Sequence, residues 1–326
     1  MGATEVAGRP VSRRAGRSLR QRESRAGFLL VSPTLLLVLV MVVLPVLWTV
    51  LLAVQRFRLS GIRHVGIFGA QYTVRNFQRL FESPDFLDSL RVTLLYSILG
   101  TAGSIGLGLV AALVVRSTFP GRTLVRGAML LPYVAPIVAV AFVWQVVLNP
   151  QFGIVNALGT RVLHWGDAVP FLSEERGTLE LFGLRLGVPT ALVVVILFEA
   201  WRYFPFAFLF ILARLQALPA ELDEAARVDG ATPLQRFWYI TLPQLQGVIA
   251  LLAVLRFIWT FNEFDDIYLL TGGGAGTEVL GVQVYNFLTA RNDVGASAAV
   301  ALLMAAVMAV FVGVYLRFFV PREEAP

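Results

Sequence analysis

The segment FLLVSPTLLLVLVMVVLPVLWTVLLAV, residues 28–54, contains 27 residues and no charged side chain. A helix rises about 1.5 Å per residue, so roughly 20 apolar residues cross a bilayer core about 30 Å thick. The segment is therefore long enough to span a membrane. It is too long for the apolar part of a signal peptide and no small-residue cleavage site follows it, so we expect it to be retained.

Five further segments pass the same length test. Two of them carry charged residues that a lipid-facing helix would not tolerate: Glu199 and Arg202 in one, and Arg256, Glu263, Asp265 and Asp266 in the other. The sequence thus predicts an all-α membrane protein with one membrane-spanning domain over residues 27–320. Its six expected spans are 28–54, 92–115, 127–148, 186–213, 247–270 and 294–316.

The composition agrees with a membrane protein and excludes several activities. Hydrophobic residues make up 57% of the chain and charged residues 15%, against about a quarter in soluble domains. All 27 basic residues are arginine, so the chain has no lysine with which to build its own P-loop ATPase. It also has no cysteine and two histidines, which excludes a thiol nucleophile and a Cys/His zinc site.

The arginines indicate the orientation of the chain. Seven of them lie in residues 1–26, which we expect to form a disordered cytoplasmic tail. With that end inside, the inner segments hold 15 arginines and the outer segments 10, so both termini, including residues 321–326, are expected in the cytoplasm. A basic tail beside a span also explains the net charge of +6 without a nucleic-acid partner.

Residues 218–243, between the fourth and fifth spans, are expected to fold as two short helices. Pro219 suits the start of the first helix and Gly230 its left-handed end. Thr232 and Gln235 have the spacing of a capping box, and Pro243 is expected to limit the second helix. The apolar face of this second helix must be covered by the chain, by a partner or by the membrane surface; it comprises Leu234, Phe237, Trp238 and Thr241.

Short motifs in this loop and elsewhere resemble one protein family. Those in the loop are Glu224-Ala225-Ala226, Asp229-Gly230-Ala231, Phe237, Ile240 and Leu242-Pro243. Those outside it are Phe68-Gly69, Asn76-Phe77, Asp85-Phe86, Gly153 with Asn156, Phe261-Asn262, Phe264-Asp265, Leu270-Thr271 and Gly273-Gly274. They resemble the permease subunits of bacterial binding-protein-dependent ABC importers, and within these the first permease of maltose- or glycerol-phosphate-type carbohydrate systems.

This resemblance implies a type I importer fold in the bacterial inner membrane and a transport subunit that is not itself an enzyme. It implies four kinds of partner: a second homologous permease, two ATP-binding subunits, an external solute-binding protein and a carbohydrate substrate. ATP and Mg²⁺ would bind to the ATP-binding subunits, and this chain would need no cofactor. Residues 219–243 would be the coupling loop that docks on an ATPase, through Glu224, Ala225, Ala226, Asp229, Gly230 and Phe237.

The fifth span indicates where the substrate would pass. On an unbroken helix Trp259, Asn262, Glu263 and Asp266 would share one face, and with Asp265 and Tyr268 they would suit a sugar, whose hydroxyls bond carboxylates and amides and whose C–H face packs on aromatic rings. The alternative is structural: Arg256 would pair with Glu263, and Glu199 with Arg202.

Three classes of function remain at this stage. The favoured one is an ATP-driven importer subunit that translocates a di- or oligosaccharide. The second is an ion-coupled secondary transporter that uses Glu263, Asp265 and Asp266, which would leave the folded loop 219–243 unexplained. The third, a membrane-embedded enzyme, is disfavoured because the chain has no Gly-x-Ser-x-Gly or His-Glu-x-x-His motif.

Overall fold

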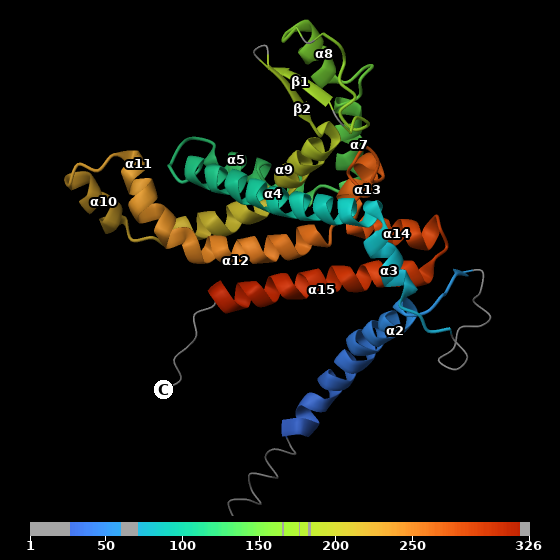
Figure 1. Ribbon diagram of the computed structural model, residues 1–326. Coiled ribbons are helices and arrows are strands. Elements are labelled where there is room, and N and C mark those ends of the chain that lie inside the picture. Colours follow the sequence, from blue (N-terminus) through green and yellow to red (C-terminus); the bar gives the residue numbers. More distant parts are fainter. Residues whose placement is uncertain (1–26, 60–70, 165, 176, 182–183, 320–326) are drawn as a thin grey trace, which may run out of the picture. The chain divides into compact units, whose positions relative to one another are not determined.

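The computed structural model describes residues 27–59, 71–164, 166–175, 177–181 and 184–319. The tails 1–26 and 321–326 and the motif Phe68-Gly69 lie outside these residues. The chain divides into two units, residues 1–52 and 53–326. In the first unit a helix follows the predicted span: Gly27–Ala53 is long and apolar enough to cross a membrane, and it includes the π-helical turn η1 (Leu39–Val43) and α2 (Leu44–Ala53) (Figure 1).

In the second unit the helices α4 (Pro84–Val114) and α9 (Thr190–Gln216) pack along each other (Figure 1). Glycines of α4 permit this close approach: a Cβ atom on Gly108 would lie 2.7 Å from Ala207 Cβ, and one on Gly100 would lie 2.7 Å from Glu199 Cγ. The side of α4 that carries these glycines is therefore a packing face. α4 begins eight residues earlier than predicted, because Pro84 fits the first position of a helix.

The predicted third span is not one straight helix. It is divided into α5 (Arg122–Ala128), α6 (Leu131–Val134) and α7 (Ile137–Val147), with a bend of 95° between the last two. Ala135 is extended at the break because it precedes Pro136, and a residue before proline disfavours the helical conformation. The described residues thus contain five helices able to cross a membrane, or six if this bent pair counts as one span.

The predicted start of the fourth span is also wrong, since residues 186–188 belong to a strand. The strands β1 (Gly177–Leu181) and β2 (Leu184–Val188) form an antiparallel hairpin, and α9 begins after Pro189. The helix α8 (Ile154–Arg161) precedes the hairpin. The buried amide of Asn156 in α8 fastens this segment: it donates to the carbonyl of Val169 at 3.0 Å and accepts from the Val169 N–H at 2.7 Å.

The loop between α9 and the next span is folded as two helical segments, as predicted. They are α10 (Ala220–Val228) and a helix that begins with α11 (Pro233–Arg236). Both hydrogen bonds of the Thr232–Gln235 capping box are present, and Gly230 has a φ of 76°. The second helix does not stop at Pro243, contrary to the prediction. It continues through the π-helical turn η3 (Phe237–Thr241), which accommodates the missing N–H of the proline, into α12 (Leu242–Phe261).

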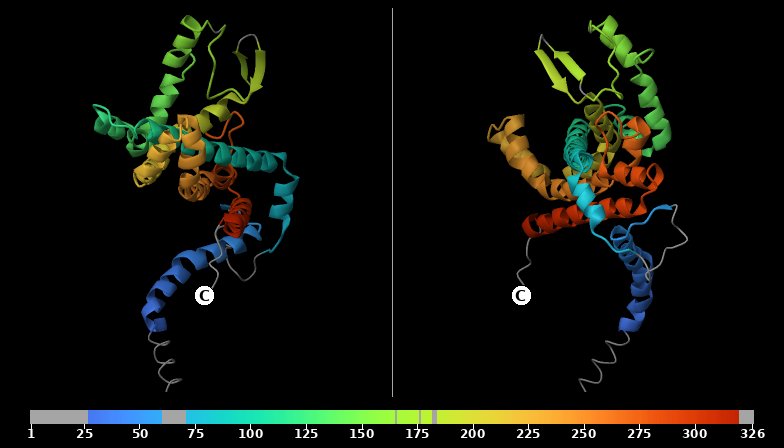
Figure 2. Two further views of the ribbon diagram at one scale, coloured as in Figure 1. Left: turned by 90° about the vertical axis from the view of Figure 1, so that its left-hand side faces the viewer. Right: turned by 45° about the vertical axis from the view of Figure 1, so that its right-hand side comes forward.

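The predicted fifth span ends early, at Phe261, and the chain resumes helix at α13 (Asp265–Thr271). Asn262 favours this end because its side-chain amide donates to the carbonyl of Ile258 at 2.7 Å. The remaining helices are α3 (Arg75–Glu82), α14 (Leu280–Thr289) and α15 (Val294–Phe319). α12 packs against α4, α9 and α15 (Figure 2), and α13 packs against α7 and α9, so other helices flank the break between α12 and α13.

Candidate functional site

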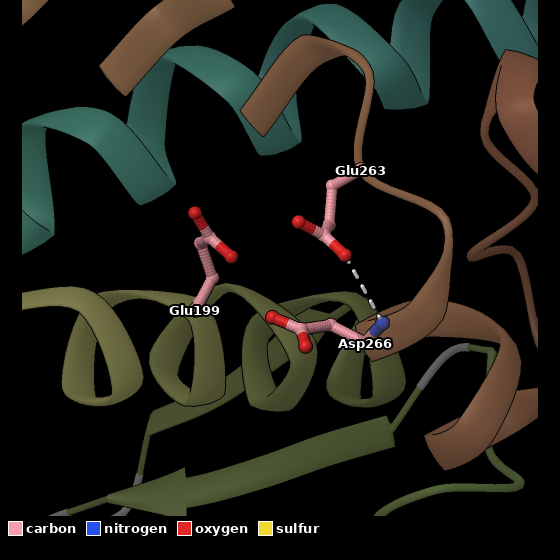
Figure 3. A group of neighbouring side chains, drawn as sticks. All are labelled: Glu199, Glu263 and Asp266. Carbon is pink, nitrogen blue, oxygen red and sulfur yellow. Dashed lines mark hydrogen bonds between the residues drawn. The ribbon is translucent and has the colours of Figure 1, made fainter. Parts of the chain in front are cut away.

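Three carboxylates converge at the break between α12 and α13. Glu199 comes from α9, Glu263 from the linker and Asp266 from the first turn of α13, and one oxygen of each lies within 4.8 Å of the others (Figure 3). Glu199 and Asp266 are fully buried. The backbone N–H of Asp266 donates to Glu263 at 3.4 Å. The sequence could not show this group, because Glu199 is distant in the chain and the helix carrying Glu263 was expected to be unbroken.

Two buried arginines neutralise most of this acidic cluster. Arg256 is ion-paired with Glu199, and their side chains are 2% and 0% exposed. Arg202 Nε lies 3.7 Å from Asp266 Oδ1. Both predicted structural pairs, Arg256 with Glu263 and Glu199 with Arg202, are therefore replaced by pairs between different helices. Spacing along one helix identified charged residues that needed partners, but it could not identify the partners.

Two hydroxyl groups also donate hydrogen bonds to the carboxylate of Glu199. Tyr96 on α4 donates to Glu199 Oε2 at 2.9 Å, and Thr260 on α12 donates to Glu199 Oε1 at 2.7 Å. Tyr203 donates to Glu263 Oε2 at 3.4 Å, and the guanidinium of Arg256 lies 4.1 Å from the centre of its ring. The cluster thus ties together α4, α9, α12 and the linker. Because two of the three carboxylates already face arginine, this donor set suits a structural charge network better than a metal ion.

The residues expected along a substrate pathway separate into two groups. Asp266 is buried in the charge network and Glu263 is half-buried, whereas Asn262 and Asp265 are exposed and Trp259 and Tyr268 are 44% and 38% exposed. The predicted single helical face is wrong, because the helix ends before Asn262. The exposed group nevertheless remains in one stretch of chain that flanks the break.

Aromatic residues from other helices extend this exposed group. The ring of Phe206 on α9 lies 5.1 Å from Trp259 and 4.9 Å from Phe210. Tyr133 on α6 lies 6.2 Å from Phe206 and is 42% exposed. On the other side of the break Tyr268 lies between Phe264 and Tyr285, at 4.9 and 5.0 Å. Sequence reasoning missed Tyr133, Phe206 and Tyr285 because nothing in their local spacing connects them to Trp259 or Tyr268.

The folded loop is a second candidate site, and it presents a surface that the described chain does not cover. Glu224, Ala225, Asp229 and Gly230 are exposed, and Ala226 and Phe237 are half-buried. Apolar side chains surround them: Val228 is 88% exposed, Leu234 67% and Trp238 56%. Of the predicted apolar face only Thr241 is buried. Such a concentration of exposed apolar side chains marks a surface for binding another molecule.

Comparison with known proteins agrees with these features. Residues 104–324 match the family described as "Binding-protein-dependent transport system inner membrane component". The permease protein YcjO of an inner membrane ABC transporter of Escherichia coli (strain K12) is 36% identical over 85% of this chain and 88% of its own length. The permease protein MalF of a trehalose/maltose transport system of Thermococcus litoralis is 31% identical over 92% and 95%.

A solved structure shows the same fold. It is a chain of a bacterial alginate ABC transporter in complex with an alginate pentasaccharide-bound periplasmic protein, and the match has a TM-score of 0.69, 24% identity and coverage of 92% and 95%. The chain belongs to the family of binding-protein-dependent transport system inner membrane components, and it is a multi-pass permease subunit of an ABC transporter.

Proposed function

We propose that this permease imports a carbohydrate. It would do so together with a second homologous permease, two ATP-binding subunits and an external solute-binding protein. Its termini would lie in the cytoplasm. The observation that carries the proposal is the exposed surface of residues 219–243. MalF of Thermococcus litoralis belongs to a trehalose/maltose system, and the solved alginate transporter includes a periplasmic protein carrying a pentasaccharide. Both support a saccharide as the transported molecule, with a di- or oligosaccharide favoured.

The loop would dock on an ATP-binding subunit. An ATPase needs a lysine to bind phosphate in its P-loop, and this chain has none, so the energy must come from another polypeptide. Val228, Leu234 and Trp238 would supply the apolar part of the docking surface, with Glu224 as its charged contact. ATP is cytoplasmic, so this loop would face the cytoplasm. With six spans, both termini then lie on the same side.

The sugar would pass along the exposed group beside the helix break. Trp259 and Phe206 would pack against its C–H face, whereas Asn262 and Asp265 would bond to its hydroxyls. Tyr268 would belong to the same path, and Glu263 would contact both the path and the charge network. Asp266 is enclosed with Arg202, so its role would be to support this surface from behind.

A docking test separates this function from an ion-coupled transporter. The epitope-tagged permease is purified from native membranes, and the amount of ATP-binding subunit that accompanies it is measured. Glu224→Lys and, separately, Gly230→Pro should lower that amount at least tenfold while leaving the abundance of the permease in the membrane unchanged. Glu82→Lys, the same reversal of charge at an exposed position on α3, is the control and should retain the ATPase.

A transport test then examines the substrate path. Uptake of radiolabelled trehalose and maltose into membrane vesicles should require ATP and resist a protonophore. Trp259→Ala should raise the KM for the transported sugar at least fivefold without reducing the amount of assembled complex. Uptake that continues without ATP and collapses with the protonophore would instead establish ion coupling, and full co-purification of the Glu224→Lys variant would refute the docking surface.

A further inference from the structure

The two helical segments of the docking loop are joined by one ion-pair group. Asp223 on α10 accepts hydrogen bonds from Arg236 Nη1 on α11 at 2.9 Å through each carboxylate oxygen. The same carboxylate accepts one from Arg227, on its own helix, at 2.8 Å. The side chains of Asp223 and Arg236 are 24% and 17% exposed, whereas Arg227 is 64% exposed. Of these Asp223 contacts, those to Arg236 join the two helices, whereas the one to Arg227 stays within α10.

Little else holds α10 in place. None of the described side chains from residue 221 to residue 228 is buried. The connection to α11 runs through Gly230, whose φ of 76° fits a turn and around which a Cβ atom would meet nothing within 4 Å. Two backbone bonds close the turn, Gly230 N–H to Arg227 O and Ala231 N–H to Ala226 O. Without Asp223, the direction of α10 relative to α11 would depend mainly on this glycine turn, which has open space around it.

The partner of Asp223 lies at the base of a long continuous helix. This continuous helix runs from Pro233 to Phe261, 29 residues, and comprises α11, η3 and α12. We call it the rod. Near its far end Arg256 enters the buried pair with Glu199, and just beyond that end are Asn262 and the helix break. A displacement at the base of the rod would therefore reach both the charge network and the exposed group beside it.

We propose that Asp223 is a positioning residue that locks α10 to the rod through Arg236, so that a displacement of α10 moves the rod instead of bending the turn at Gly230. This inference rests on the proposed docking of α10 on an ATP-binding subunit. An ion pair that water still reaches contributes little to global stability, so we expect its main effect to be on the angle between the two helices. The lock assigns a role to Asp223 and Arg236, which the docking contacts do not include.

The angle can be measured by pulsed electron paramagnetic resonance, because the chain has no native cysteine to interfere with spin labelling. One label is placed at Glu221→Cys on α10 and the other at Gln246→Cys on the rod; both positions are exposed. Distances are recorded in the permease alone and in the complex with its ATPase, at rest and after trapping with ATP and vanadate. The distribution for the native loop should be narrow in every state.

Asp223→Asn should at least double the width of this distribution, Asp223→Glu should restore it, and Arg227→Gln should leave it narrow because the bond between the helices remains. The ATPase should also co-purify with the Asp223→Asn variant within twofold of the parent amount. An unchanged width in Asp223→Asn, or equal broadening in Arg227→Gln, would overturn the lock. If the ATPase fails to accompany the parent permease, the docking function fails, whereas the measurement on the permease alone still decides whether the lock exists.

Discussion

Glu199→Gln is expected to destabilise the permease strongly, because it leaves Arg256 buried without its counter-charge. The pair is 0% and 2% exposed, and removal of one partner from a buried pair costs roughly 3–5 kcal/mol. The glutamine retains the shape of the side chain, but its single carbonyl oxygen can take only one of the two positions to which Tyr96 and Thr260 donate, so the loss reports the charge together with one of these hydrogen bonds. At roughly 2–4 °C per kcal/mol, the melting temperature should fall by about 6–20 °C.

The assay is thermal unfolding of the detergent-purified chain, followed by the loss of the monodisperse peak on size-exclusion chromatography. Two further variants isolate the pair: Arg256→Gln alone and the double variant Glu199→Gln/Arg256→Gln. The double variant should lose clearly less than the sum of the single losses, because it leaves neither charge unpaired. Glu263→Gln serves as the control within the cluster, because its carboxylate is not one of the two that face an arginine, and it should cost much less than Glu199→Gln. A Glu199→Gln loss below about 1 kcal/mol, or strictly additive losses, would refute the reasoning.

Three further perturbations test the packing, the loop and the outer segment. Gly108→Ala should lower stability by about 1–3 kcal/mol in the same thermal assay, because its Cβ would lie 2.7 Å from Ala207 Cβ, whereas Gly106→Ala faces open space and should be neutral or stabilising. Thr232→Ala should cost about 0.5–2 kcal/mol of local stability by removing the capping box, seen as faster amide exchange over residues 220–243, and Thr232→Ser should retain protection. Asn156→Ala should leave the Val169 N–H unpaired and accelerate proteolysis between residues 149 and 188 at least threefold; an unchanged cleavage rate would contradict the anchoring role of this amide.

The sequence by itself determined the class of the protein. Uninterrupted apolar length predicts membrane helices without any knowledge of their neighbours, since each helix satisfies its own backbone hydrogen bonds. The first span, the folded loop with its capping box and the left-handed Gly230 follow from such local rules, and the structure confirms them. The absence of lysine likewise predicts that this chain does not build a P-loop ATPase of its own. The motifs of the loop indicated the family, which the comparisons confirm.

The tertiary structure decided where helices break and which charges meet. The helices on either side of the bend at Pro136 and of the end of α12 at Asn262 pack against other helices, whose positions apolar length does not reveal, so the sequence predicted unbroken spans there. Arg256 and Glu199 are 57 residues apart, and the close packing of α4 against α9 forms part of the site at which they pair. A buried charge needs a partner of opposite charge, but which residue becomes that partner depends on proximity in the folded chain. Periodicity within one helix carries no information about that proximity.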